Sequence, residues 1–168
     1  MTNSQPVEPA ITDRPAQPYV AVRQLVTMRT IPEIADRLPE VFGWLAGHGA
    51  VPAGAPFLKY NVIDMERELE IEAGVPVAAE LAGERPVFGG VLPAGRYVTL
   101  THHGHPAGLV PVVAGMLAWA GERGLRWDSR GTDAGEWWGC RLEIYHTDPA
   151  VQPDLNKWAT ELAFRLAD

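Results

Sequence analysis

Residues 137–149 decide the interpretation of this chain, and they read Trp-Trp-Gly-Cys-Arg-Leu-Glu-Ile-Tyr-His-Thr-Asp-Pro. The run is mostly apolar and aromatic, and Thr-Asp-Pro at its end predicts a turn. Alternate side chains of a β-strand point to opposite faces, so Arg141, Glu143 and Tyr145 should share one face. A glutamate among bulky aromatic groups loses hydration, and it must be paired, protonated or placed to receive a cation. Pairing with Arg141 is the purely structural alternative, because ion pairs also place carboxylates in strands.

The composition predicts a soluble globular protein with a single domain. The 168 residues are 46% hydrophobic and 21% charged, enough for one sizeable core and too few for two domains. A net charge of −7 with only 14 scattered Lys and Arg argues against binding to a phosphate backbone. Cationic or neutral small molecules suit this charge better, and six Trp and four Tyr supply flat surfaces for them.

The sequence shows neither a secretion signal nor a membrane span. The longest apolar run, residues 107–121, is interrupted by Pro111 and falls short of the ~18 residues that a span needs. The single cysteine, Cys140, excludes a disulfide framework and a CxxC motif. We therefore expect a cytoplasmic protein.

The start of the chain predicts a tail, a strand and a broken helix. Four prolines among small polar residues make residues 1–18 a loose, disordered tail. The β-branched run 19–28 is typical of a strand. A helix should follow it and break near Leu38, because Pro39 lies inside the helical pattern.

Two strands are expected next, at residues 56–62 and 66–77. In the second, acidic residues alternate with apolar ones, which predicts a solvated strand face rather than a metal site. The acidic residues are Glu68, Glu70 and Glu72.

The second half predicts a strand at 96–102, a buried apolar helix at 109–120 and a closing helix over 155–166, whose apolar residues recur at helical spacing. Between the first two lie His102, His103 and His105. Neighbouring rings on an extended chain point apart, and no Cys or carboxylate completes a metal shell there. We expect an exposed turn, with no metal and no cofactor.

A weak internal repeat sets the expected fold class, which is α+β. Strands that open with Tyr-Val, helices that end near Trp and strands that end in Tyr each occur twice. This pattern predicts duplicated β-α-β-β halves with pseudo-twofold symmetry, an antiparallel sheet with helices on one face, and a ligand groove between the halves. The repeated marks are 19–20 and 97–98, 44–47 and 119–121, and Tyr60 and Tyr145.

Taken together, these marks resemble the GyrI-like small-molecule-binding domain, which is also the effector-binding module of multidrug-responsive and AraC-type transcription regulators. The resemblance implies one such domain over residues 19–168. The residues that carry it are Pro93-Ala94-Gly95-Arg96-Tyr97, Gly104, Trp119, and Leu142-Glu143-Ile144-Tyr145 followed by Asp148-Pro149.

The resemblance also implies where ligands bind. In the family, the glutamate that matches Glu143 lies at the bottom of an aromatic groove and receives cationic or polar groups of flat, hydrophobic ligands. Tyr145 and Tyr60 are the first candidates for the aromatic wall. Further candidates for ligand binding are Tyr97, Trp137 and Trp138, although the two tryptophans fit a core or rim equally well.

Two classes of function stay open. As a binding module, the protein would take up hydrophobic aromatic, often cationic, molecules for sequestration, sensing or toxin resistance. Some stand-alone family members are hydrolases that open cyclopropane-containing DNA-alkylating natural products, and Glu143 would then be the general base, with Tyr145 as the second catalytic residue. A weaker interpretation is a modulator that contacts DNA gyrase. The sequence has no helix-turn-helix pattern, so we expect no direct nucleic-acid contact and no membrane partner.

Overall fold

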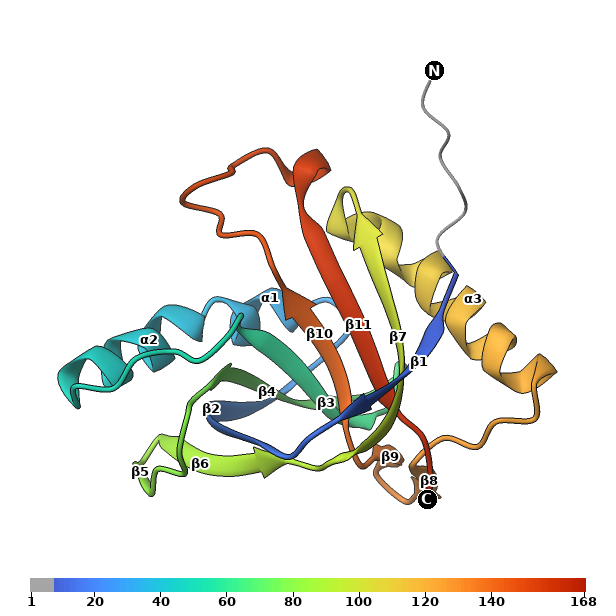
Figure 1. The fold of residues 1–168 in the computed structure, drawn as a ribbon, viewed down its shortest axis with the longest axis horizontal. Coiled ribbons are helices and arrows are strands. Elements are labelled where there is room, and N and C mark those ends of the chain that lie inside the picture. Colours follow the sequence, from blue (N-terminus) through green and yellow to red (C-terminus); the bar gives the residue numbers. More distant parts are fainter. Residues whose placement is uncertain (1–7) are drawn as a thin grey trace.

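The computed structural model describes residues 8–168 as one curved antiparallel sheet of eleven strands with three α-helices (Figure 1). The elements of the first half are β1 (Ala10–Arg14), β2 (Gln17–Val26), α1 (Ile31–Ala35), α2 (Leu38–Gly47), β3 (Phe57–Ile63), β4 (Leu69–Pro76), β5 (Gly83–Glu84) and β6 (Val87–Leu92). Those of the second half are β7 (Gly95–His103), α3 (Leu109–Glu122), β8 (Ser129–Thr132), β9 (Gly135–Trp138), β10 (Arg141–Tyr145) and β11 (Ala159–Arg165).

Six strands form the centre of the sheet, in the order β7-β11-β10-β3-β4-β2. β10 and β3 meet in the middle, and on either side the order of strands mirrors the other half. The α+β class with an antiparallel sheet is confirmed. Two β-α-β-β halves would produce this order, while the duplication itself stays a prediction.

The helices pack against one face of the sheet, which is the face of Glu143. Leu58 and Leu162 lie directly opposite Glu143 on the neighbouring strands. Leu58 belongs to the core cluster under α1 and α2, and Leu162 belongs to the cluster under α3. The expected helix break is confirmed, because α1 ends at Ala35 and Pro39 lies in the first turn of α2, where a missing N–H is tolerated.

The opposite face curls around a second core. β6 and β7 lie near the two ends of the sheet, yet only Pro93 and Ala94 separate them along the chain. This short connection draws the ends together (Figure 1). Gly74 is required inside the curl, because a Cβ there would lie 2.6 Å from the Phe57 ring. The enclosed side chains include Tyr19, Phe57, Leu92, Tyr97, Leu142 and Ile144.

The expected closing helix over 155–166 is wrong. Residues Leu155–Lys157 form one 3-10 turn, and Ala159–Arg165 form β11 between β10 and β7. A central strand is buried on both faces, so Leu162, Ala163 and Phe164 are all buried and the two-residue alternation is hidden. The same apolar residues also fit a helical spacing, and tertiary pairing decides between the two.

The expected loose tail over 1–18 needs a correction as well. Residues 1–7 lie outside the described residues, but Ala10–Arg14 form β1, paired with β7, and β2 already begins at Gln17. The side chains of β1 are mostly exposed, so its composition resembles that of a tail. Backbone hydrogen bonds to an available sheet edge, rather than side-chain burial, explain this strand.

The expected solvated face of β4 is wrong at Glu72. This residue is only 4% exposed, whereas Glu68 is exposed. Its carboxylate accepts hydrogen bonds from Tyr19 Oη at 2.5 Å and Asn61 Nδ2 at 2.6 Å, and Lys59 Nζ lies 3.4 Å away. The curl of the sheet covers this part of β4, and the cluster supplies the partners that a buried carboxylate requires.

Candidate functional site

β10 holds Glu143 in the middle of the sheet. Ladder hydrogen bonds to β3 and β11 fix the backbone on both sides. Leu142 and Ile144 point into the curled core, so the residues between them point to the helical face. The predicted division of this strand between two faces is confirmed. A rigid central strand is a suitable support for a side chain that must keep a fixed position.

Two tyrosine hydroxyls surround the carboxyl group of Glu143. Tyr145 Oη donates a hydrogen bond to Glu143 Oε2 at 2.9 Å. Burial raises the pKa of Glu143, and hydrogen bonding from Tyr145 and Tyr60 opposes that rise. Burial also raises the pKa of both tyrosines well above the usual range, so they stay protonated donors. The structure therefore brings together the three residues that sequence analysis placed first.

Arg141 does not form an ion pair with Glu143. Among the described residues, no nitrogen of Arg141 lies within the 4.0 Å of a Glu143 oxygen that an ion pair requires. Its guanidinium instead lies over the rings of Phe164 at 4.4 Å and Trp138 at 4.9 Å. Burial lowers the pKa of Arg141, and its charge lowers the pKa of Glu143 less than the hydrogen bonds from Tyr145 and Tyr60 do. The structural alternative for Glu143, a salt bridge within its own strand, is therefore wrong.

Thr160 is a buried polar residue beside Tyr145 that the sequence did not reveal. It lies on β11 directly opposite Tyr145. The residue is fully buried, and its Oγ1 has no hydrogen-bond partner among the described residues. A buried hydroxyl without a partner is uncommon and can serve a ligand. Sequence analysis placed this residue in a helix, so its position across from Tyr145 could not be anticipated.

The remaining candidates lie apart from the carboxyl group. Tyr97 lies in the curled core on the other face, where its hydroxyl donates to the carbonyl of Pro93 at 2.6 Å. Trp138 is buried in the cluster under α3 and reaches the site only through Arg141. Trp137 is partly exposed on β9, with the guanidinium of Arg130 over its ring.

His102 and His103 are the last residues of β7, and only His105, at the start of a 3-10 turn, lies in the expected turn. His105 accepts a hydrogen bond from the backbone N–H of Ala107, and the His102 ring lies 3.1 Å from the His105 carbonyl oxygen. Across residues 8–168, no group of three or more His, Cys, Asp or Glu is placed to hold a metal ion. In the same part of the chain, no helix is both long and apolar enough to cross a membrane.

A known protein family matches nearly the whole sequence. The sequence matches the model of the GyrI-like small molecule binding domain over residues 7–167. The chain belongs to this family. A comparison with curated protein sequences gives no match.

Solved structures share the fold of this GyrI-like domain. The C-terminal domain of EcmrR aligns with a TM-score of 0.75 at 16% identity, covering 98% of this chain and 99% of that one. In an EcmrR complex with DNA, the TM-score is 0.76 at 17% identity, with 96% of this chain covered, and this chain spans only 58% of that EcmrR chain. The structure of SAV2435 bound to tetraphenylphosphonium aligns with a TM-score of 0.63 at 10% identity, covering 95% of this chain and 94% of SAV2435. A hydrolase from Listeria innocua aligns with a TM-score of 0.60 at 14% identity, covering 95% of this chain and 92% of the hydrolase.

Proposed function

We propose that this GyrI-like domain binds hydrophobic aromatic, often cationic, small molecules at Glu143, for sequestration, sensing or toxin resistance. The observation that carries the proposal is a partly exposed glutamate whose carboxyl group accepts a hydrogen bond from Tyr145, lies beside Tyr60 and forms no salt bridge within residues 8–168. A carboxylate in this setting lacks full hydration, so a desolvated cation beside it relieves that loss. Tyr145, which is partly exposed, adds ring surface for stacking, and cation–π attraction favours the same class of ligand.

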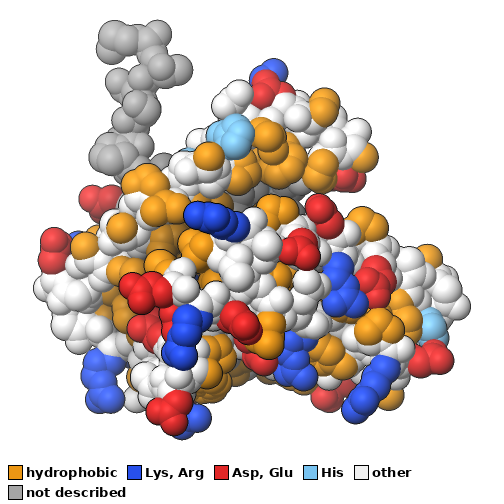
Figure 2. Space-filling view, turned by 180° about the vertical axis from the view of Figure 1, so that it is seen from behind, with side chains coloured by type: hydrophobic (Ala, Val, Ile, Leu, Met, Phe, Trp, Pro, Cys, Tyr) orange, Lys and Arg blue, Asp and Glu red, His pale blue; other side chains and the backbone are white. Residues whose placement is uncertain are grey.

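Two further observations support a small ligand over a macromolecule. Tetraphenylphosphonium, bound by SAV2435, is a hydrophobic aromatic cation, and that protein has the same fold. Figure 2 shows acidic and basic side chains interspersed over one face of the molecule, with no broad area of a single sign. An acidic surface that could replace DNA in a contact with gyrase is not evident on that face.

The test compares a cation with a neutral molecule of similar shape. Tetraphenylphosphonium and triphenylphosphine oxide are titrated into wild type, Glu143→Gln and the control Glu68→Gln, and the melting temperature is followed. We expect the cation to stabilise wild type and Glu68→Gln, and to lose about tenfold or more in affinity in Glu143→Gln, since a charge-assisted contact of about 1.4 kcal/mol or more is removed. Equal losses for both probes would refute the role of the charge.

A hydrolase is the second candidate, because the raised pKa of Glu143 suits a general base that works near neutral pH. Water would add to a strained cyclopropane carbon while Glu143 takes its proton, the ring C–C bond breaks, and the proton passes to the carbon or oxygen that receives the electron pair. Mass spectrometry of a cyclopropane-bearing alkylator should then show one added water with wild type and none with Glu143→Gln. Turnover that persists in the variant would exclude Glu143 as the base.

A further inference from the structure

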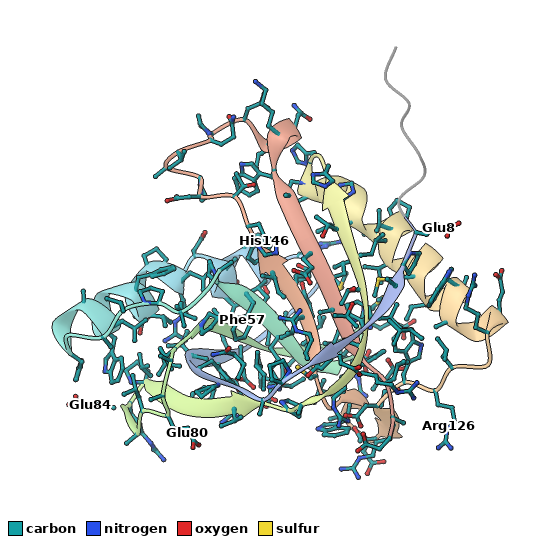
Figure 3. All side chains as sticks on the ribbon, viewed as in Figure 1. Glu8, Phe57, Glu80, Glu84, Arg126 and His146 are labelled. Carbon is teal, nitrogen blue, oxygen red and sulfur yellow. The ribbon has the colours of Figure 1, made fainter. Side chains whose placement is uncertain are left out.

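A cavity of about 220 Å³ opens on the face of the sheet opposite Glu143. Its floor belongs to the curled core and is apolar. Ile144 and Phe57 are neighbours in the ladder between β10 and β3, and Leu142 follows on the same face. Figure 3 labels Phe57 and His146, which lie at this end of β3 and β10. The apolar lining consists mainly of Phe57, Leu92, Leu142 and Ile144.

Three charged or titratable side chains stand together at one side of this cavity. Glu161 Oε2 lies 3.2 Å from a terminal nitrogen of Arg14, and its Oε1 lies 2.7 Å from His146 Nε2. Both carboxylate oxygens are therefore engaged, and the charge of Glu161 is balanced by Arg14. All three side chains keep part of their surface exposed, between 22% and 43%, so a ligand can reach them.

In this cluster Arg14 has N–H donors left for a ligand, whereas the carboxylate of Glu161 is already engaged by Arg14 and His146. Among residues 8–168, the guanidinium of Arg14 makes one hydrogen bond, to Glu161, although the group carries five N–H donors. Its remaining donors suit a carboxylate, which guanidinium groups bind in a two-point geometry. A cationic ligand would meet Arg14 and find Glu161 already satisfied. Gln17, the other polar side chain nearby, is fixed by hydrogen bonds to the carbonyls of Pro18 and Val77.

We propose that this cavity is a second small-molecule site, which takes a compact hydrophobic carboxylic acid. The acid group would bind Arg14 beside His146, and the hydrophobic body would lie against Ala53, Ala55 and Pro76, above the largely covered side chain of Ile144. A volume of about 220 Å³ is below the range of about 300–1,000 Å³ typical of drug-sized ligands, so one ring with a short chain is the expected size. The site prefers anions, whereas the Glu143 site is proposed to prefer cations.

The experiment uses three probes with the same hydrophobic body: 3-phenylpropanoate, 3-phenylpropan-1-ol and 3-phenylpropylammonium. Each is titrated into the full chain by NMR, and dissociation constants are taken from shifts of backbone amides. We expect the acid to bind at least tenfold more tightly than the amine, with shifts in β3 and β10 around Phe57 and Ile144. Glu143→Gln should leave the affinity for the acid unchanged, which separates this site from the proposed cation site.

Two substitutions in the cluster should act in opposite directions. Arg14→Gln should weaken binding of the acid about tenfold, because the cationic donor is lost. Glu161→Gln should strengthen it, because Arg14 no longer has a carboxylate partner in the protein. A merely structural cluster would make both variants worse, so weaker binding in Glu161→Gln would overturn the proposal. Equal affinity for acid and amine would also overturn it.

A third variant tests the cavity without changing any charge. Gly54 lines the mouth, and an added Cβ there meets only ordinary contacts with Pro76. Gly54→Phe should fill the mouth and abolish binding of the acid while the amide spectrum stays that of the folded protein. Binding that survives this substitution would place the acid elsewhere and would contradict the proposal.

Discussion

Tyr145 favours the charged form of Glu143. Its hydroxyl donates to Glu143 Oε2 at 2.9 Å, and this bond opposes the rise in pKa that burial causes. Tyr145→Phe removes the donor, so the pKa of Glu143 should rise further above its ordinary value. A carboxyl-selective ¹³C NMR titration would measure it. Tyr97→Phe is the matched control, because that hydroxyl lies on the other face and should leave the pKa of Glu143 unchanged. A pKa that does not move in Tyr145→Phe would show that the bond is weak in solution.

Sequence reasoning located the centre of the site because one strand carries most of it. Glu143 and Tyr145 are two residues apart, so strand alternation alone puts them on one face. Tyr60 came from the internal repeat, and the sheet order places its strand beside β10. Thr160 and Glu161 were missed, because their positions depend on which strand pairs with β10. The register of distant segments is set by tertiary packing, which a single sequence does not display.

Strands β2, β3 and β4 are joined inside the curl by the hydrogen bonds of Glu72. Tyr19 on β2 donates to this carboxylate, as does Asn61 on β3. Tyr19→Phe leaves part of a buried charge without its partner, so the free energy of unfolding should fall by about 1–3 kcal/mol. Urea unfolding followed by tryptophan fluorescence would measure the loss. Tyr97→Phe, which removes a bond to a neutral carbonyl, should cost only about 1 kcal/mol. Equal losses in the two variants would contradict a special role for the carboxylate.

At the level of elements, features set by local chemistry were predicted, whereas β1 and β11, whose structure depends on pairing with distant strands, were not. The break between α1 and α2 follows from the chemistry of Pro39 alone. β11 was mistaken for a helix because burial on both faces removes the alternation that marks a strand. β1 was overlooked because it is held mainly through its backbone, and its side chains are those of a loop. Glu72 was assigned to solvent because the curl that covers it involves β6 and β7, far away in sequence.

Burial of Glu143 should lower the free energy of unfolding of the whole molecule wherever this residue is charged. Burial raises the pKa of this residue above its usual value of 4.5 in the folded protein. At a pH between the ordinary pKa of the unfolded chain and the raised pKa of the folded protein, the folded state holds more protons than the unfolded state. The free energy of unfolding therefore falls as the pH rises through that interval. Below it, both states are protonated and the loss is absent. The charged site thus works against the fold at neutral pH, as expected where a residue is kept for binding rather than for packing.

Glu143→Gln keeps the shape of the side chain without its charge and should remove this loss. The difference in unfolding free energy between variant and wild type should be small below the ordinary pKa of 4.5 and grow in favour of the variant as the pH rises above it, as measured by urea unfolding at each pH. The lowered pKa values of Glu40 and Asp64 have the opposite effect on stability, but they are the same in both proteins and cancel in the difference. Glu68→Gln, on the surface, should give a flat difference. If the stability difference for Glu143→Gln is equally independent of pH, or if this variant is less stable than wild type at pH 7, then Glu143 is neutralised by the folded protein itself. It would then have no charge to offer a cationic ligand.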